Sequence, residues 1–107
     1  MSQKKTGKKR RRVIYQKTAL PVVFTKEGNR ISAHSPALNL ATCGKTFEDA
    51  KKMFEECVEL FFQEIHKDGT LDEVLTDLGW VKVHKKEWAP PAYVGTVNEE
   101  IKIPCYT

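Results

Sequence analysis

The sequence lacks any apolar run close to the ~20 residues that a membrane-spanning helix needs. No apolar stretch follows the basic residues at the N-terminus, so we expect no secretory signal and a cytoplasmic protein. Cysteine is scarce, with three residues and no CxxC pair. An odd number of isolated cysteines argues against a disulfide framework and fits a reducing compartment.

Carboxylates are also missing from the part of the chain that predicts the sheet. Between residues 13 and 43 the only acidic residue is Glu27, in a predicted turn. Metal-dependent and two-carboxylate mechanisms need acids that project from rigid strands into a cleft. We therefore expect no catalytic residues, no metal and no cofactor, and classify the chain as a binding protein and not an enzyme.

Two weaker chemical arrangements stay open on the sequence. Cys43 and His34 on neighbouring strands could act as nucleophile and base, although no signature of a catalytic cysteine surrounds them. A zinc site from these two residues with Cys57 and His66 is the second arrangement, but its spacing matches no usual zinc motif. The simpler interpretation places His34 on the solvent face of a strand and Cys57 on the apolar face of a helix.

The charge of the chain is segregated along its length. Of 107 residues, the first 12 hold seven of the 18 basic residues and no acid, so the remainder carries 11 bases against 14 acids, a net charge of −3. We expect a disordered basic tail over residues 1–12, because it has almost no apolar residues to bury. Its cations are candidate phosphate contacts for nucleic acid: Lys4, Lys5, Lys8, Lys9, Arg10, Arg11 and Arg12.

The first half of the body predicts three short strands. Residues 13–25 are rich in β-branched and aromatic side chains and predict a strand, although Pro21 removes a donor and makes it irregular. A glycine-containing turn leads to a second strand over residues 30–35. A brief third strand follows over residues 40–43. Short connections between these segments predict an antiparallel arrangement.

The strongest element is a helix from Phe47 to about Lys67. Thr46 is a suitable N-cap, with Asp49 at the third helical position. Apolar residues recur at the helical spacing: Phe47, Ala50, Phe54, Cys57, Val58, Phe61 and Ile65.

Three further apolar residues of this helix, Met53, Leu60 and Phe62, widen the apolar arc to roughly 200°. One sheet face covers only part of such an arc. We therefore predict an oligomer interface at these three residues, in a homodimer or tetramer.

The C-terminal part predicts a second, shorter helix between Thr70 and Gly79, capped by a T-x-x-E box. A strand over residues 80–83, a loop over 87–91 and a possible edge strand over 100–104 follow. The fold class is thus α+β, a two-layer sandwich. Its antiparallel sheet of three to four strands starts β-β-β and packs against one long and one short helix. We expect this domain to span residues 13–83, with a C-terminal loop and possible edge strand over 84–107.

Residues 18–62 resemble the HicB-like antitoxin family, in which a strand, an acidic or glycine turn, a G-y-x-A-x-x-P-x-L segment and a G-x-T turn followed by an alanine lead into an amphipathic helix. Each matching position also has a plain structural role. Gly28 lies two residues farther from Ala33 than the pattern has it, and the family's P-x-L-P-G-C loop is replaced here by PALNL. The matching residues are Gly28, Ala33, Pro36, Leu38, Gly44, Thr46 and Ala50.

The resemblance implies a degraded ribonuclease H-like fold and a protein that binds and occludes a small basic HicA-like toxin that cleaves messenger RNA. An acidic body suits such a partner. Residues 80–107 contain no operator-binding motif of the kind that family members often carry. The alternative function is a stand-alone nucleic-acid-binding protein that acts through the basic tail.

Overall fold

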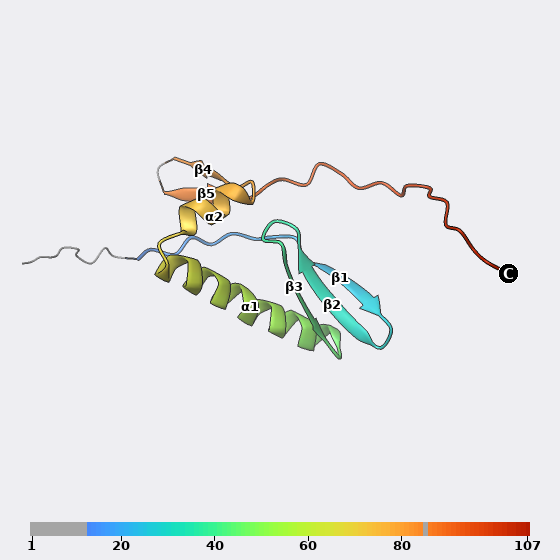
Figure 1. Cartoon of the computed structure of the whole chain (residues 1–107). Helices are drawn as coiled ribbons and strands as arrows, with labels where there is room; N and C mark the ends of the chain where they lie inside the picture. The colour runs from blue at the N-terminus through green and yellow to red at the C-terminus, as the bar shows by residue number, and fades with distance from the viewer. Residues whose placement is uncertain (1–12, 85) are drawn as a thin grey trace, which may run out of the picture.

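The computed structural model describes residues 13–84 and 86–107, and the α+β class is confirmed. The basic tail predicted over residues 1–12 lies outside the described residues. Figure 1 shows the elements in chain order: β1 (Val23–Glu27), β2 (Arg30–Ser35), β3 (Leu40–Gly44), α1 (Phe47–Lys67), α2 (Leu71–Asp77), β4 (Val81–Val83) and β5 (Glu87–Ala89).

The three strands β1, β2 and β3 form an antiparallel sheet in sequence order, and α1 packs against one face of it (Figure 1). Ala33 in the centre of β2 and Ala50 in the first turn of α1 are both fully buried, and Phe54 beside them is buried. Small side chains on both elements let the helix approach the central strand closely. This contact forms the first of two apolar clusters.

The second cluster joins the connection between β2 and β3 to the C-terminal half of the body. It contains Ala37, Leu38, Leu75 and Trp80, all buried. The indole Nε1 of Trp80 donates a hydrogen bond of 2.8 Å to the carbonyl oxygen of Ala37. A buried tryptophan needs such an acceptor, because an unpaired indole N–H away from water is costly.

The strand predicted over residues 13–25 is wrong in its first part, because β1 begins only at Val23. Pro21 cannot donate to a ladder, so pairing starts after it. The Gln16 side chain bonds instead to the backbone of β5. Its Nε2 donates to the Trp88 carbonyl oxygen at 2.7 Å, and the Trp88 N–H donates to Oε1 at 2.8 Å.

The C-terminal prediction also needs correction. Glu87–Ala89 lies in the predicted loop but forms β5, which pairs with β4 in a separate two-stranded sheet. The packed body therefore continues past residue 83, to Ala89. Residues 100–104, the possible edge strand, form no strand. The chain after β5 instead runs away from the body (Figure 1), and the molecule measures 76 × 30 × 26 Å.

The two predicted helix caps have different outcomes. Thr46 caps α1 as expected, since its hydroxyl accepts a hydrogen bond of 3.0 Å from the Asp49 N–H. Thr70 precedes α2 but makes no side-chain cap bond, so the capping box predicted there is wrong. The backbone at Thr70 has ψ 13°, outside the extended region that an N-cap hydroxyl needs to reach the helix.

Candidate functional site

The residues that match the HicB-like pattern form the joint between the sheet and α1. Gly28 takes a φ of +63° in the turn between β1 and β2, as the turn requires. Ala33 and Ala50 meet in the first cluster, and Leu38 lies in the second. Pro36 follows the last residue of β2, where it was expected. These residues position surfaces and do not themselves form a polar site.

The sequence predicts that Gly44 supplies the turn after the third strand, but the structure gives it a different role. It ends β3 without a positive φ, so backbone freedom does not explain it. A Cβ atom at this position would lie 2.6 Å from the backbone nitrogen of Ala50. Glycine is required here because the end of β3 and the first turn of α1 nearly touch.

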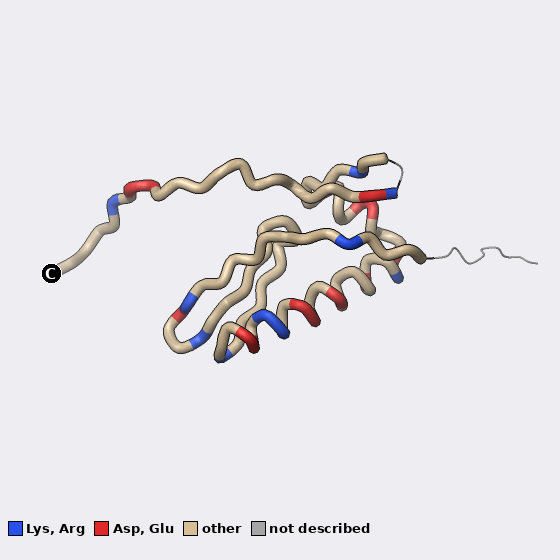
Figure 2. The backbone as a smooth tube through the Cα atoms, turned by 180° about the vertical axis from the view of Figure 1, so that it is seen from behind, with Lys and Arg blue, Asp and Glu red and all other residues tan. Residues whose placement is uncertain are grey.

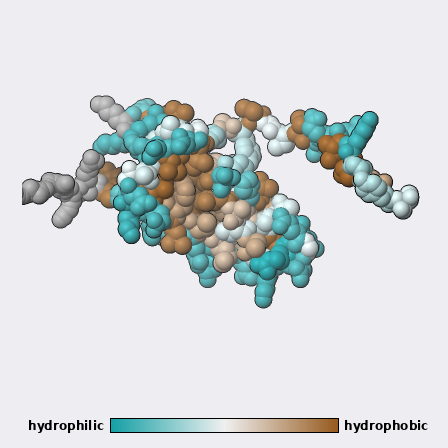
Figure 3. Space-filling view, viewed as in Figure 1, coloured by the Kyte–Doolittle hydropathy of each residue, from teal (hydrophilic) through white to brown (hydrophobic). Residues whose placement is uncertain are grey.

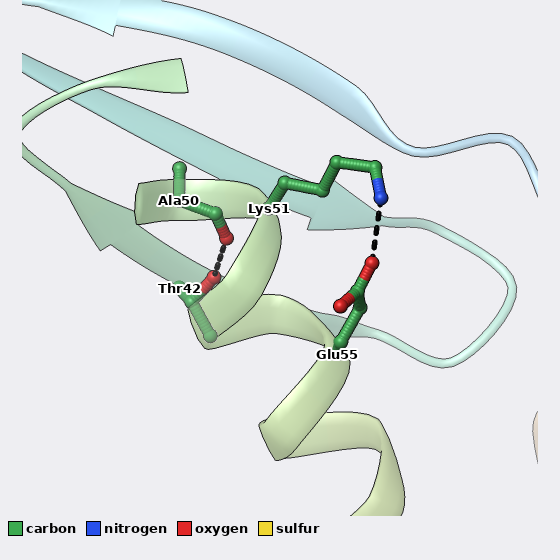
Figure 4. A network of polar contacts seen from close by, with 4 residues as sticks. All are labelled: Thr42, Ala50, Lys51 and Glu55. Carbon is green, nitrogen blue, oxygen red and sulfur yellow. Dashed lines mark hydrogen bonds and ion pairs between the residues drawn. The ribbon is translucent and has the colours of Figure 1, made fainter. Parts of the chain in front are cut away.

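Polar contacts reinforce the same joint (Figure 4). The Thr42 hydroxyl of β3 donates a hydrogen bond of 3.3 Å to the Ala50 carbonyl oxygen in α1. On the exposed side of the helix, Lys51 Nζ and Glu55 Oε2 lie 2.6 Å apart. The orientation of α1 over the sheet is therefore fixed by packing on one side and a backbone–side-chain bond at β3.

The apolar residues predicted to form an oligomer interface lie on two different sides of α1. At about 100° per residue, Met53 and Leu60 fall on one margin of the buried face and Phe62 on the opposite margin. Met53 is 49% exposed and Leu60 is 61% exposed. Phe62 packs within its own chain against the second cluster. The three residues do not form one continuous surface.

Met53 and Leu60 alternate with acids on a line along α1, which we name the acidic–apolar stripe. Spacings of three and four residues place its members on one helix face. All five are exposed, and none of the three acids makes an ion pair with a residue described by the structure. Figure 2 shows the acidic positions along the helix. The stripe consists of Asp49, Met53, Glu56, Leu60 and Glu64.

Phe62 lines an apolar cavity of about 450 Å³ between α1 and the small lobe formed by α2, β4 and β5. The cavity also touches Leu20, Trp80 and Trp88. Figure 3 shows hydrophobic side chains gathered on this side, between α1 and the pair of strands β4 and β5. Its polar lining residues are Gln16, Thr18 and Lys86.

His34 and Cys43 lie on the sheet face that α1 does not cover. Cys43 is opposite Ser32 in the ladder and His34 is opposite Ala41, so the two are not paired across the strands. Both border a wide, open depression, and the Arg30 guanidinium donates to the Cys43 sulfur at 3.3 Å. An open sheet face gives a nucleophile no enclosed pocket in which to bind a substrate.

The sheet also separates the residues of the possible zinc site. Cys57 and His66 belong to α1, on the other side of the sheet from Cys43 and His34. Across residues 13–84 and 86–107, no group of three or more His, Cys, Asp or Glu side chains converges to hold a metal ion.

The candidate nucleic-acid contacts, Lys4 to Arg12, lie outside the described residues, so their placement is not described. Neither helix of the described chain combines the length and apolar character of a membrane span.

Two features of the surface escaped prediction. The acids of the stripe and their helical spacing to Met53 and Leu60 are visible in the sequence, but only the position of the sheet shows that this face of α1 is exposed. The contact between Gln16 and Trp88 carries no sequence signal, because it joins one side chain to a distant strand edge. Comparison with known proteins adds nothing to these observations: no family model, curated protein or solved structure matches the chain.

Proposed function

We propose that this chain is a non-catalytic, HicB-like antitoxin-type protein of the cytoplasm that binds and occludes a small basic HicA-like toxin. The acidic–apolar stripe of α1 is the observation that carries the proposal. Exposed Met53 and Leu60 supply apolar contact, and the three acids beside them, which form no ion pair within the described residues, attract a cationic surface. The motif residues support it by holding this helix rigidly on the sheet.

The stripe favours a basic partner over a second copy of the chain. In a symmetric dimer the same patch meets itself, so Asp49, Glu56 and Glu64 would face identical acids. Like charges brought together at an interface oppose association. A cationic ribonuclease would instead neutralise them while covering Met53 and Leu60. We therefore assign these two residues to the toxin, and the interface between copies has to lie elsewhere.

The direct test uses the reading frames next to this chain's own gene. Each is expressed alone and together with the chain. A small basic protein is expected to arrest growth and degrade messenger RNA when alone, and to co-purify with the chain in a growing culture when both are present. Finding neighbours that neither arrest growth nor bind the chain would contradict the proposal.

The surface assignment is tested with the double variant Glu56→Lys and Leu60→Gln in the full chain. Both side chains are exposed, so the fold should survive, and circular dichroism checks this. Toxin affinity measured by calorimetry is expected to fall by about tenfold or more. The control is Glu73→Lys in α2, which changes the charge as Glu56→Lys does but lies away from the stripe. It should leave the affinity for the toxin within about twofold of wild type. Equal losses in both variants would show that only net charge matters.

A second function is supported by one observation, the seven cations among the first 12 residues. Such a segment binds nucleic acid with little sequence preference and strong salt dependence. If it acts alone, replacing all seven cations by serine in the full chain should abolish binding to duplex DNA and RNA while the body stays folded. Unchanged binding would exclude the tail as the nucleic-acid contact.

A further inference from the structure

The segment after β5 carries several apolar side chains that are exposed in the described chain. Residues 93–107 are all exposed, and this includes Val94 at 100%, Ile101 at 71% and Ile103 at 69%. Tails that remain free in solution are poor in such residues, because they have no core in which to bury them. β-Branched residues at alternate positions fit a pleated strand. The segment therefore has the composition of a β-strand, although it pairs with no strand in the described chain.

The body offers a strand edge that lacks a partner. In the described chain β1 pairs only with β2, so its other edge is open. Next to this edge, Phe47 of α1 stacks on Phe24 of β1 with ring centroids 4.3 Å apart, yet Phe47 stays 48% exposed. The edge of β5 is different, because Gln16 already bonds to the backbone of Trp88 there.

We propose that residues 98–103 of a second copy of this chain add to the free edge of β1 as an antiparallel strand. One antiparallel register satisfies several requirements at once. With Ile101 opposite Phe24, the period of two places Glu99 opposite Lys26 on the same face. Ile101 then covers the exposed edge of Phe47, and Glu99 meets a cation.

In this register the proposed strand pairing ends at a proline in each of the two chains. Pro104 falls opposite Pro21, and neither residue has an N–H to donate, so neither can extend the ladder and the pairing ends there. Ile103 falls opposite Val22, which packs on the first cluster. On the opposite face, Glu100 lies across from Thr25 and Lys102 across from Val23.

The direction of the chain indicates a second copy and not the chain's own tail. The segment leaves β5 and runs along the molecule in the same direction as β1 (Figure 1), and Figure 2 shows the same arrangement from behind. To pair antiparallel with its own β1, the segment would have to reverse its course. In a two-fold dimer the partner's segment already runs the opposite way, and each copy gives one strand and receives one.

The length of the segment is sufficient for this exchange. It comprises 18 residues after Ala89, which span up to about 60 Å when extended. Charge also favours the contact. The strand ends on either side of the turn between β1 and β2 carry Lys26 and Arg30 against Glu27, whereas the segment carries Glu99 and Glu100 against Lys102. Figure 2 shows charged positions of both signs at the two places.

The first test measures the mass of the full chain by size exclusion with light scattering. Wild type is expected to be a dimer at about 100 µM, within the range of ordinary interfaces. The double variant Ile101→Asp and Ile103→Asp should raise the dissociation constant about 100-fold or more, because two apolar anchors are lost at each joint. Val94→Asp is the control outside the register and should stay dimeric. A monomeric wild type, or a dimer unaffected by the double variant, would overturn the proposal.

The second test fixes the register by cross-linking, with exposed Cys43 and Cys105 replaced by serine. Thr25→Cys combined with Glu100→Cys places both thiols on the same sheet face and should give a disulfide-linked dimer on a non-reducing gel. Lys26→Cys combined with Glu100→Cys places them on opposite faces and should give none. A disulfide that forms only within one chain, or equal cross-linking in both variants, would also overturn the proposal.

Discussion

Single residues at the joint of sheet and helix have effects on stability that the structure specifies. Gly44→Ala would add a methyl group 2.6 Å from the Ala50 backbone nitrogen, where the neighbour is main chain and cannot rotate away. We expect the free energy of unfolding in urea to fall by about 2 kcal/mol. Gly95→Ala, where nothing lies within 4 Å, should change it by less than about 0.5 kcal/mol. Similar values for the two variants would contradict the close approach.

Ser35 is the opposite case, because replacing its hydroxyl group should increase the stability of the fold. Its side chain is fully buried on β2, and its hydroxyl has no hydrogen-bond partner among the described residues. Burying an unpaired hydroxyl costs free energy. Ser35→Ala is expected to raise the free energy of unfolding by about 1 kcal/mol, measured by denaturant titration. Ser32→Ala, on the open face of the same strand, serves as the control, and a loss of stability at Ser35 would show that its hydroxyl is satisfied.

At the scale of the element, the two threonines that precede the helices should contribute different amounts to the free energy of unfolding. Thr46 accepts a hydrogen bond from the first turn of α1, whereas Thr70 makes no such bond to α2. Thr46→Ala should therefore lower the free energy of unfolding by about 1 kcal/mol. Thr70→Ala should have a clearly smaller effect in the same thermal or urea measurement. Equal losses would mean that the cap bond contributes little and that threonine acts through its backbone preference.

The elements also show where prediction from the sequence succeeded. Helix α1 and strands β2 and β3 follow from periodicity, the Thr46 cap and the turn at Gly28, which are local signals. Strand β5 has only three residues and two prolines after it, so its pairing with β4 depends on a tertiary contact that periodicity does not encode. The apolar arc of α1 was visible, but its division into two margins depends on which face meets the sheet.

At the scale of the whole molecule, the two apolar clusters differ in how far apart in sequence their members lie. The first joins β2 to the start of α1, residues close in the chain. The second includes Trp80, whose indole N–H donates to the carbonyl oxygen of Ala37, 43 positions earlier in the chain. The lobe that covers this cluster is held by Gln16, which bonds to the backbone of Trp88, 72 positions away. The cavity is lined by residues as far apart in sequence as Gln16 and Trp88, which explains why sequence windows alone did not reveal it.

This separation has a consequence for synthesis on the ribosome. Translation proceeds from the N-terminus, so the sheet and α1 emerge and can pack while the strands of the β4–β5 hairpin are still inside the exit tunnel. During that interval Leu38 and the side of α1 that carries Phe62 are exposed to solvent, because the elements that pack on them have not yet been released. The nascent chain is therefore most prone to aggregation late in its own translation, and it is protected only when the last elements of the body have been released.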